Sequence, residues 1–126
     1  MQRNTKQRTA ILKALQQHDQ PLSVAELLEF ASRDIPRLGI ATVYRTLKSL
    51  QEDGSITQVS IHGNAPYYEL SGKHHHHHFQ CEVCHSVKDI DACLIDEKKF
   101  TSLLKKSGLK VNHHEITLFG SCEHCR

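Results

Sequence analysis

Apolar residues in the first half of the chain recur with the period of a helix. A first helix is expected over 5–17, where the core-facing positions are Ile11, Leu12 and Leu15. Ser23 and Glu26 form a capping-box pattern that opens a second helix, whose apolar positions are Leu27, Leu28 and Phe30. Pro36 then interrupts the pattern. A third helix is expected over 40–53, ending at Gly54.

The third helix has two different faces. Its apolar face consists of Ile40, Val43, Leu47 and Leu50. Its other face consists of Ala41, Thr42, Arg45, Lys48 and Ser49, with Tyr44 at the border. Cations neutralise phosphates and short side chains let a helix approach bases, so this face suits a DNA major groove. The alternative is an ordinary solvated helix face.

Two strands are expected after the third helix. They cover 56–61 and 66–70, and the segment from His62 to Ala65 joins them as a hairpin turn. Three helices followed by a hairpin is the order of a winged helix-turn-helix. This order favours the DNA-binding interpretation of the third helix.

The second half begins with an unusual run, HHHHHFQCEVC, from His74 to Cys84. Alternate side chains of an extended chain face opposite ways, so His74, His76 and His78 would share one face and His75 and His77 the other. One short strand could therefore supply two metal sites. Further elements are expected at 87–90 (strand), 96–107 (helix, stopped by Gly108), 109–111 (strand) and 115–119 (strand).

Charge and composition limit the classes of protein to which this chain could belong. The formal net charge is only +2, but Arg37, Arg45 and Lys48 fall in a stretch without any acid. No apolar run approaches the roughly 18 residues that a membrane span needs. The amino-terminal residues lack the apolar core of a signal peptide, so a cytoplasmic protein without membrane contact is expected.

Cysteine spacing gives the strongest chemical signal. The two CxxC pairs, Cys81 with Cys84 and Cys122 with Cys125, can close a tetrahedral four-sulfur shell around structural Zn(II). A redox CxxC would need a βαβ context that the pattern lacks. Cys93 is left over and is expected to be a small buried apolar residue.

The combination of GIATVYRTL at 39–47 with the histidine strand and CxxC resembles the ferric uptake regulator family of bacterial metal-sensing repressors. The resemblance covers nearly the whole chain. It implies an α/β (α+β) protein with a winged-helix DNA-binding domain over 1–70, a hinge over 71–73 and an α/β dimerisation domain over 74–126. It also implies a homodimer that binds palindromic operator DNA and represses metal-uptake genes.

The resemblance also assigns residues to roles. DNA contacts are expected from Arg8, Tyr44 and Arg45. The small and cationic face of the third helix adds Thr42 and Lys48. A regulatory hinge site for Zn(II) or Fe(II), with Mn(II) as a further candidate, is expected from Glu69, His76, His78 and Asp89, with His62 as a candidate fifth ligand. A second site in the dimerisation domain is expected from His75, His77, Asp96 and His114.

Two departures from the family pattern leave the sensed metal open. Many iron-sensing members supply a histidine near the position of Pro21, and many zinc-sensing members have a cysteine in the hinge site. The alternatives are a manganese- or peroxide-responsive regulator of the same family, or a zinc storage or chaperone protein. An enzyme is not expected, because the HExxH and deaminase zinc motifs are absent.

Overall fold

A computed structural model describes residues 5–61, 65–93 and 95–126 of the chain. The chain divides into two compact units, Met1–Lys73 and His74–Arg126. The boundary between them directly follows the last residue of the predicted hinge. None of the helices among the described residues has the length and apolar character needed to cross a bilayer.

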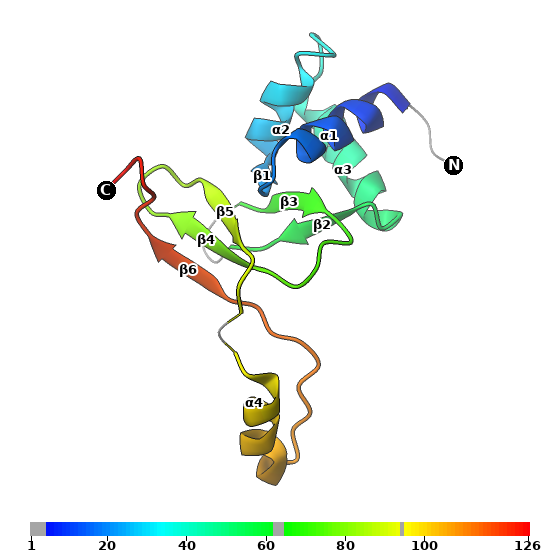
Figure 1. The fold of residues 1–126 in the computed structure, drawn as a ribbon. Helices are drawn as coiled ribbons and strands as arrows, with labels where there is room; N and C mark the ends of the chain where they lie inside the picture. Colours follow the sequence, from blue (N-terminus) through cyan, green and yellow to red (C-terminus); the bar gives the residue numbers. More distant parts are fainter. Residues whose placement is uncertain (1–4, 62–64, 94) are drawn as a thin grey trace. The chain divides into compact units, whose positions relative to one another are not determined.

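The first unit places three helices on a small sheet (Figure 1). Its elements are α1 (Thr5–Gln17), β1 (Leu22–Ser23), α2 (Val24–Ala31), α3 (Ile40–Glu52), β2 (Ile56–Val59) and β3 (Tyr67–Leu70). The antiparallel sheet has the order β1-β3-β2. Its core contains the fully buried side chains of Ile11, Leu22, Leu27, Leu47 and Leu50.

The helix boundaries follow from local chemistry. The Ser23 hydroxyl accepts a hydrogen bond from the Glu26 amide at 3.1 Å, and the Glu26 carboxylate accepts one from the Ser23 amide at 3.0 Å. The predicted capping box is therefore confirmed. α3 ends before Gly54, whose φ of +82° is a left-handed conformation that favours glycine.

Two expectations for the first unit were incomplete. Ile40 was assigned to the apolar face of α3, yet its side chain is 49% exposed at the first residue of the helix, whereas that of Val43 is fully buried. The two-residue strand β1 is too short to leave a periodic pattern, and it was not predicted. Residues 62–64 of the predicted hairpin turn, including the candidate ligand His62, lie outside the described residues.

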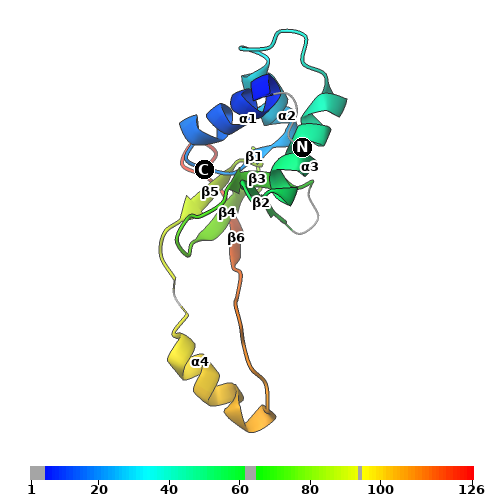
Figure 2. The same ribbon diagram turned by 90° about the vertical axis from the view of Figure 1, so that its right-hand side faces the viewer.

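The second unit is a three-stranded sheet with an outlying helix. Its elements are β4 (His77–Cys81), β5 (Val87–Ile90), α4 (Glu97–Leu104), a 3₁₀ turn (Lys105–Ser107) and β6 (Thr117–Gly120). β4 is central, antiparallel to β5 and parallel to β6. α4 lies away from this sheet, and residues 109–116 connect it to β6 without regular structure (Figures 1 and 2).

The predicted strand at 109–111 is wrong. These residues form no regular structure, because no strand pairs with the extended segment between α4 and β6 within the described residues. α4 itself contains no buried residue, and its apolar side chains Phe100 and Leu103 are 46% and 71% exposed.

Candidate metal centres and nucleic-acid face

The histidine run presents two faces, as strand alternation predicts. The rings of His76 and His78 pack edge to face with centroids 4.8 Å apart. The rings of His75 and His77 form a second edge-to-face pair, with centroids 4.6 Å apart. Since successive side chains of an extended chain point in opposite directions, the two pairs belong to opposite faces of the segment.

The four cysteines of the CxxC pairs converge at one end of the sheet. β4 ends at Cys81, which lies opposite Gly120 of β6, so the carboxy-terminal pair is brought beside the first pair. The four sulfurs lie within 4.8 Å of one another, and those of Cys84 and Cys122 are 3.8 Å apart. Tetrahedral zinc with bonds of about 2.3 Å requires sulfur separations of about 3.8 Å. The shell therefore has the size of a zinc site.

Backbone amides prepare this site for thiolates. The N–H groups of Val83, Cys84 and Cys122 each contact the buried Cys81 sulfur at 3.4 Å. These donors, that of Cys84 foremost, lower the pKa of Cys81 to about 6.

The sulfur of Cys125 shows the opposite effect. The neighbouring Cys122 group is the main cause that raises the pKa of Cys125 to about 12, so four thiolates need a cation among them. The donors fit Zn(II), and the closed shell fits a structural role.

A second cluster lies on the His76–His78 face. β4 and β5 pair His78 directly with Asp89, and the Asp89 Oδ1 atom lies 3.6 Å from His78 Nε2 and 3.9 Å from His76 Nε2. The His76 Nδ1 atom lies 2.8 Å from the His74 carbonyl oxygen, which fixes the ring so that Nε2 faces the carboxylate. Two imidazoles and a carboxylate suit Zn(II), Fe(II) and Mn(II).

Two other residues are predicted for this site, of which His62 lies outside the described residues. Glu69 lies in β3 of the first unit, where its side chain is buried and its carboxylate is 3.7 Å from Lys73 Nζ. Its membership of the site stays a prediction from the sequence, as does that of His62.

The third cluster lies on the His75–His77 face. His75 and His77 meet His114, whose ring centroid is 4.8 Å from that of His75 and 5.0 Å from that of His77. Burial is the main cause that lowers the pKa of His77, and the neighbouring histidines lower it further. A neutral imidazole is the form that binds metals.

The structure corrects the expected fourth member of this cluster. Asp96 caps α4, where one carboxylate oxygen accepts hydrogen bonds from the amides of Lys98 and Lys99 at 3.1 and 3.2 Å. It is absent from the group of potential ligands, and Cys93 is present instead. Cys93 was expected to be buried, but it is exposed, and its sulfur lies 3.3 Å from His77 Nε2 and 3.2 Å from His114 Nε2.

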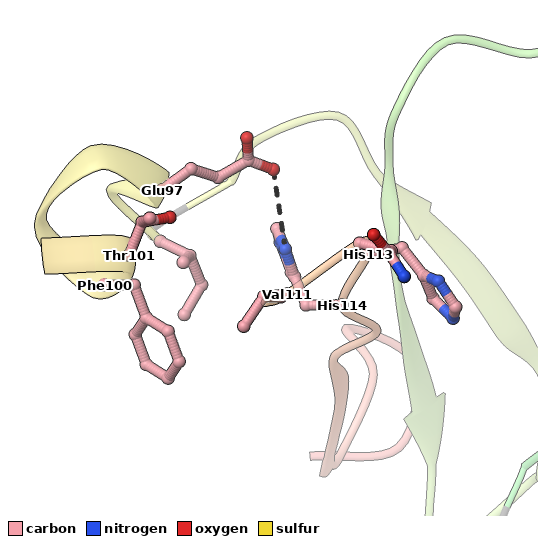
Figure 3. Close-up of a pocket in the computed structure, with 8 residues that line it drawn as sticks. Glu97, Phe100, Thr101, Val111, His113 and His114 are labelled. Atoms are coloured by element: carbon pink, nitrogen blue, oxygen red, sulfur yellow. Dashed lines mark ion pairs between the residues drawn. The ribbon is translucent and has the colours of Figure 1, made fainter. Parts of the chain in front are cut away.

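Glu97 is a further residue that sequence reasoning missed. Its Oε1 atom forms an ion pair with His114 Nδ1 at 3.8 Å, beside a small pocket between α4 and the segment from Val111 to His114 (Figure 3). The signal was present in the sequence, since a carboxylate directly follows the helix cap. Its partner depends on the path of the loop and could not be inferred from spacing.

The predicted DNA-contacting residues of α3 form an accessible face. Tyr44 is 54% exposed, and Arg45 and Lys48 are also exposed. The Arg45 guanidinium donates to the Thr42 hydroxyl at 3.0 Å, which steadies it above the helix. Arg8 is instead engaged within the unit, where it donates to Ser49 at 3.0 Å and forms an ion pair with Asp53. A DNA contact by Arg8 stays a prediction.

Comparison with known proteins identifies the family. The sequence profile of the ferric uptake regulator family matches residues 2–119. The ferric uptake regulation protein of Campylobacter jejuni is 36% identical over 124 residues, which cover 96% of this chain and 78% of that protein.

Two solved structures extend the comparison. The ferric uptake regulator of Helicobacter pylori, described as having three functional metal binding sites, matches with a TM-score of 0.81 and 26% identity over 98% of this chain and 81% of its own. A zinc uptake regulator in complex with zinc and DNA matches with a TM-score of 0.62 and 28% identity over 95% of this chain and 81% of its own. This chain belongs to the ferric uptake regulator family.

Proposed function

We propose that the protein is a metal-responsive repressor of metal-uptake genes that acts in the cytoplasm as a homodimer on palindromic operator DNA. The observation that carries the proposal is the combination of an exposed cationic helix in one unit with clusters of metal ligands in the other. A storage protein would use the histidines but would have no use for the exposed face of α3.

DNA binding is assigned to α3. Arg45 and Lys48 offer two exposed cations, Tyr44 offers an exposed ring, and the apolar residues behind them are buried. A helix anchored in this way can enter a major groove as a rigid body. The DNA complex of the related zinc uptake regulator supports this assignment.

The dimer is assigned to the second unit. Exposed apolar side chains occur on α4 and β6, and they include Leu103, Leu118 and Phe119. A helix without any buried residue gains little from folding in isolation. A second copy of the chain would cover these side chains, and a two-fold dimer would match the symmetry of a palindromic operator.

Three metal sites are proposed. Structural Zn(II) is assigned to Cys81, Cys84, Cys122 and Cys125. The regulatory site is assigned to His76, His78 and Asp89, with Glu69 as the predicted ligand from the first unit, and it would take Zn(II) or Fe(II), or Mn(II). The second site is assigned to His75, His77 and His114.

Regulation requires only linkage between metal and DNA. A metal ion shifts a conformational equilibrium by its difference in affinity for the two states. A coupling of about 3 kcal/mol would tighten operator binding by on the order of 100-fold. His76 and His78 lie just beyond Lys73, where the first unit ends, so ligands at this place are suited to restrain the linker.

The test begins with selection of binding sequences from a random duplex library by the full-length protein that holds zinc in its four-cysteine centre. Binding to the selected duplex is then measured by fluorescence anisotropy with buffered Zn(II), anaerobic Fe(II) or Mn(II). At least one metal is expected to strengthen binding. The selected sequence is expected to be palindromic.

Substitutions separate the parts of the proposal. The double substitution His76→Ala/His78→Ala should abolish the response to metal, whereas Arg45→Ala should weaken binding with every metal. Lys13→Ala is the matched control, because Lys13 is an exposed cation of α1 that pairs with Asp34 at 3.2 Å. Metal-independent binding by the wild type would refute the regulatory site, and absence of any selected sequence would favour metal storage.

A further inference from the structure

A sulfur atom joins the histidines of the second site. We propose that Cys93 is the fourth ligand of this site, that the site holds Zn(II) through three imidazoles and one thiolate, and that Glu97 positions His114 without binding the metal. The inference rests on the proposed function for the three histidines. It does not depend on which metal the regulatory site senses.

The four donor atoms already converge. His75 Nε2 and His77 Nε2 are 3.1 Å apart, and the Cys93 sulfur lies 3.3 Å from His77 Nε2 and 3.2 Å from His114 Nε2. Around tetrahedral zinc, with bonds of about 2.0–2.1 Å to nitrogen and about 2.3 Å to sulfur, such edges are about 3.3–3.6 Å. Small outward movements of the histidine rings and of exposed Cys93 would reach this geometry.

Burial of His77 adds a second, independent indication of a ligand. Its side chain is only 3% exposed, and its Nε2 atom faces both His75 and Cys93. Its Nδ1 atom has no hydrogen-bond partner among the described residues. A buried imidazole gains little stabilisation from contact with another imidazole or with a thiol alone. A cation shared by the three groups would give each donor atom a partner.

The orientation of His114 separates the roles of Cys93 and Glu97. His114 Nε2 faces the Cys93 sulfur, and His114 Nδ1 faces the Glu97 carboxylate at 3.8 Å (Figure 3). The two ring nitrogens therefore have different partners. A carboxylate that accepts a hydrogen bond from the nitrogen remote from the metal holds the ring orientation and raises its basicity. Glu97 would approach His114 Nδ1 from 3.8 Å to form this hydrogen bond. Asp96, the preceding carboxylate, instead caps α4 through its Oδ1 atom.

The thiolate would change which metals the site accepts. Three imidazoles and one thiolate favour Zn(II), whereas Mn(II) prefers oxygen ligands. The two non-cysteine sites expected from the family pattern would then differ in donors, since the His76–His78–Asp89 cluster contains nitrogen and oxygen but no sulfur. Position 93 would thus determine metal specificity at the second site.

Cobalt(II) absorption provides the test, because a cobalt–thiolate bond gives a near-ultraviolet charge-transfer band. Full-length protein with zinc in the four-cysteine centre carries His76→Ala/His78→Ala, so that the second site is the remaining proposed site. Only cobalt bound without release of zinc to a chromophoric chelator is counted. The band and tetrahedral d–d absorption are expected in this background. Cys93→Ser and Cys93→Asp should remove the band, and Cys93→Asp should also raise the affinity for Mn(II) relative to Zn(II).

Two further substitutions test the roles of the neighbours. His114→Ala should abolish binding, whereas Glu97→Gln should retain the band and weaken cobalt binding by about 10–100-fold. Cobalt binding without a sulfur band, or a band that persists in Cys93→Ser, would overturn the assignment of Cys93. Loss of binding in Glu97→Gln as complete as in His114→Ala would make Glu97 a ligand. The cobalt assay contains no DNA. A negative result would therefore concern Cys93 alone and would leave the repressor proposal untouched.

Discussion

Loss of the four-cysteine zinc is expected to unfold the second unit while the first unit stays folded. The perturbation is Cys81→Ser, which replaces the sulfur that three backbone amides contact. The reason is the size of the core. Among the described residues of the second unit, the buried apolar side chains are Val87, Cys81 and Cys122.

Zinc binding contributes more to the stability of the second unit than burial of its few apolar side chains. Complete burial of a side chain such as Val87 contributes about 1.5–3 kcal/mol. Structural zinc in small domains contributes about 10–16 kcal/mol of apparent binding free energy at neutral pH, and this free energy is available only to the folded state. The first unit has its own core of helix and sheet residues, so loss of the metal should not propagate to it.

The assay is amide hydrogen exchange of the full-length protein, with zinc content measured in parallel. Cys81→Ser should lose zinc and lose protection throughout β4, β5 and β6, while α1 and α3 stay protected. Glu123→Ser is the matched control, because the Glu123 side chain is 76% exposed between the two cysteines of the second pair. Unchanged protection of β4–β6 in a zinc-free Cys81→Ser protein would refute the reasoning.

Three further outcomes are expected. Arg45→Ala should weaken DNA binding. If the guanidinium neutralises one phosphate, the substitution should also reduce the magnitude of the slope of log affinity against log salt concentration by about 1. An unchanged slope in anisotropy titrations would exclude that contact. Ser23→Ala should destabilise the first unit by about 1 kcal/mol in urea unfolding, because the Glu26 amide loses its acceptor, and a loss no larger than that of an exposed control, Ser60→Ala, would contradict the role of the cap. Leu103→Glu should convert the dimer to a monomer in sedimentation analysis, because it places a charge on the exposed apolar face of α4. The control Lys106→Glu should leave the dimer intact. A dimer that persists in Leu103→Glu would place the interface elsewhere.

The helices of the first unit could be predicted because their signals are local. The capping box at Ser23 and the glycine at position 54 depend on residues within one turn. The strand expected at 109–111 failed because pairing depends on a neighbouring strand, which apolar composition cannot supply. The exposure of Ile40 likewise depends on where the core ends and not on helical period.

The metal sites divide in the same way. Alternation in an extended chain was sufficient to separate His76 and His78 from His75 and His77, and CxxC spacing was sufficient to group the four cysteines. The exchange of Asp96 for Cys93 could not be predicted, because it depends on the path between β5 and α4. Spacing alone gives no information on which side chain of that connection reaches His77.

The five-histidine run cannot set its own register in the sheet. A slip of one residue in β4 would turn every side chain to the opposite face, yet within His74–His78 it would merely replace one imidazole by another. The residues after the run must therefore distinguish the two pairings. Cys81 follows the run in β4 and must reach the other cysteines. The grouping of the four cysteines at the end of β4 thus favours one register of the strand, and this register assigns each histidine to one face.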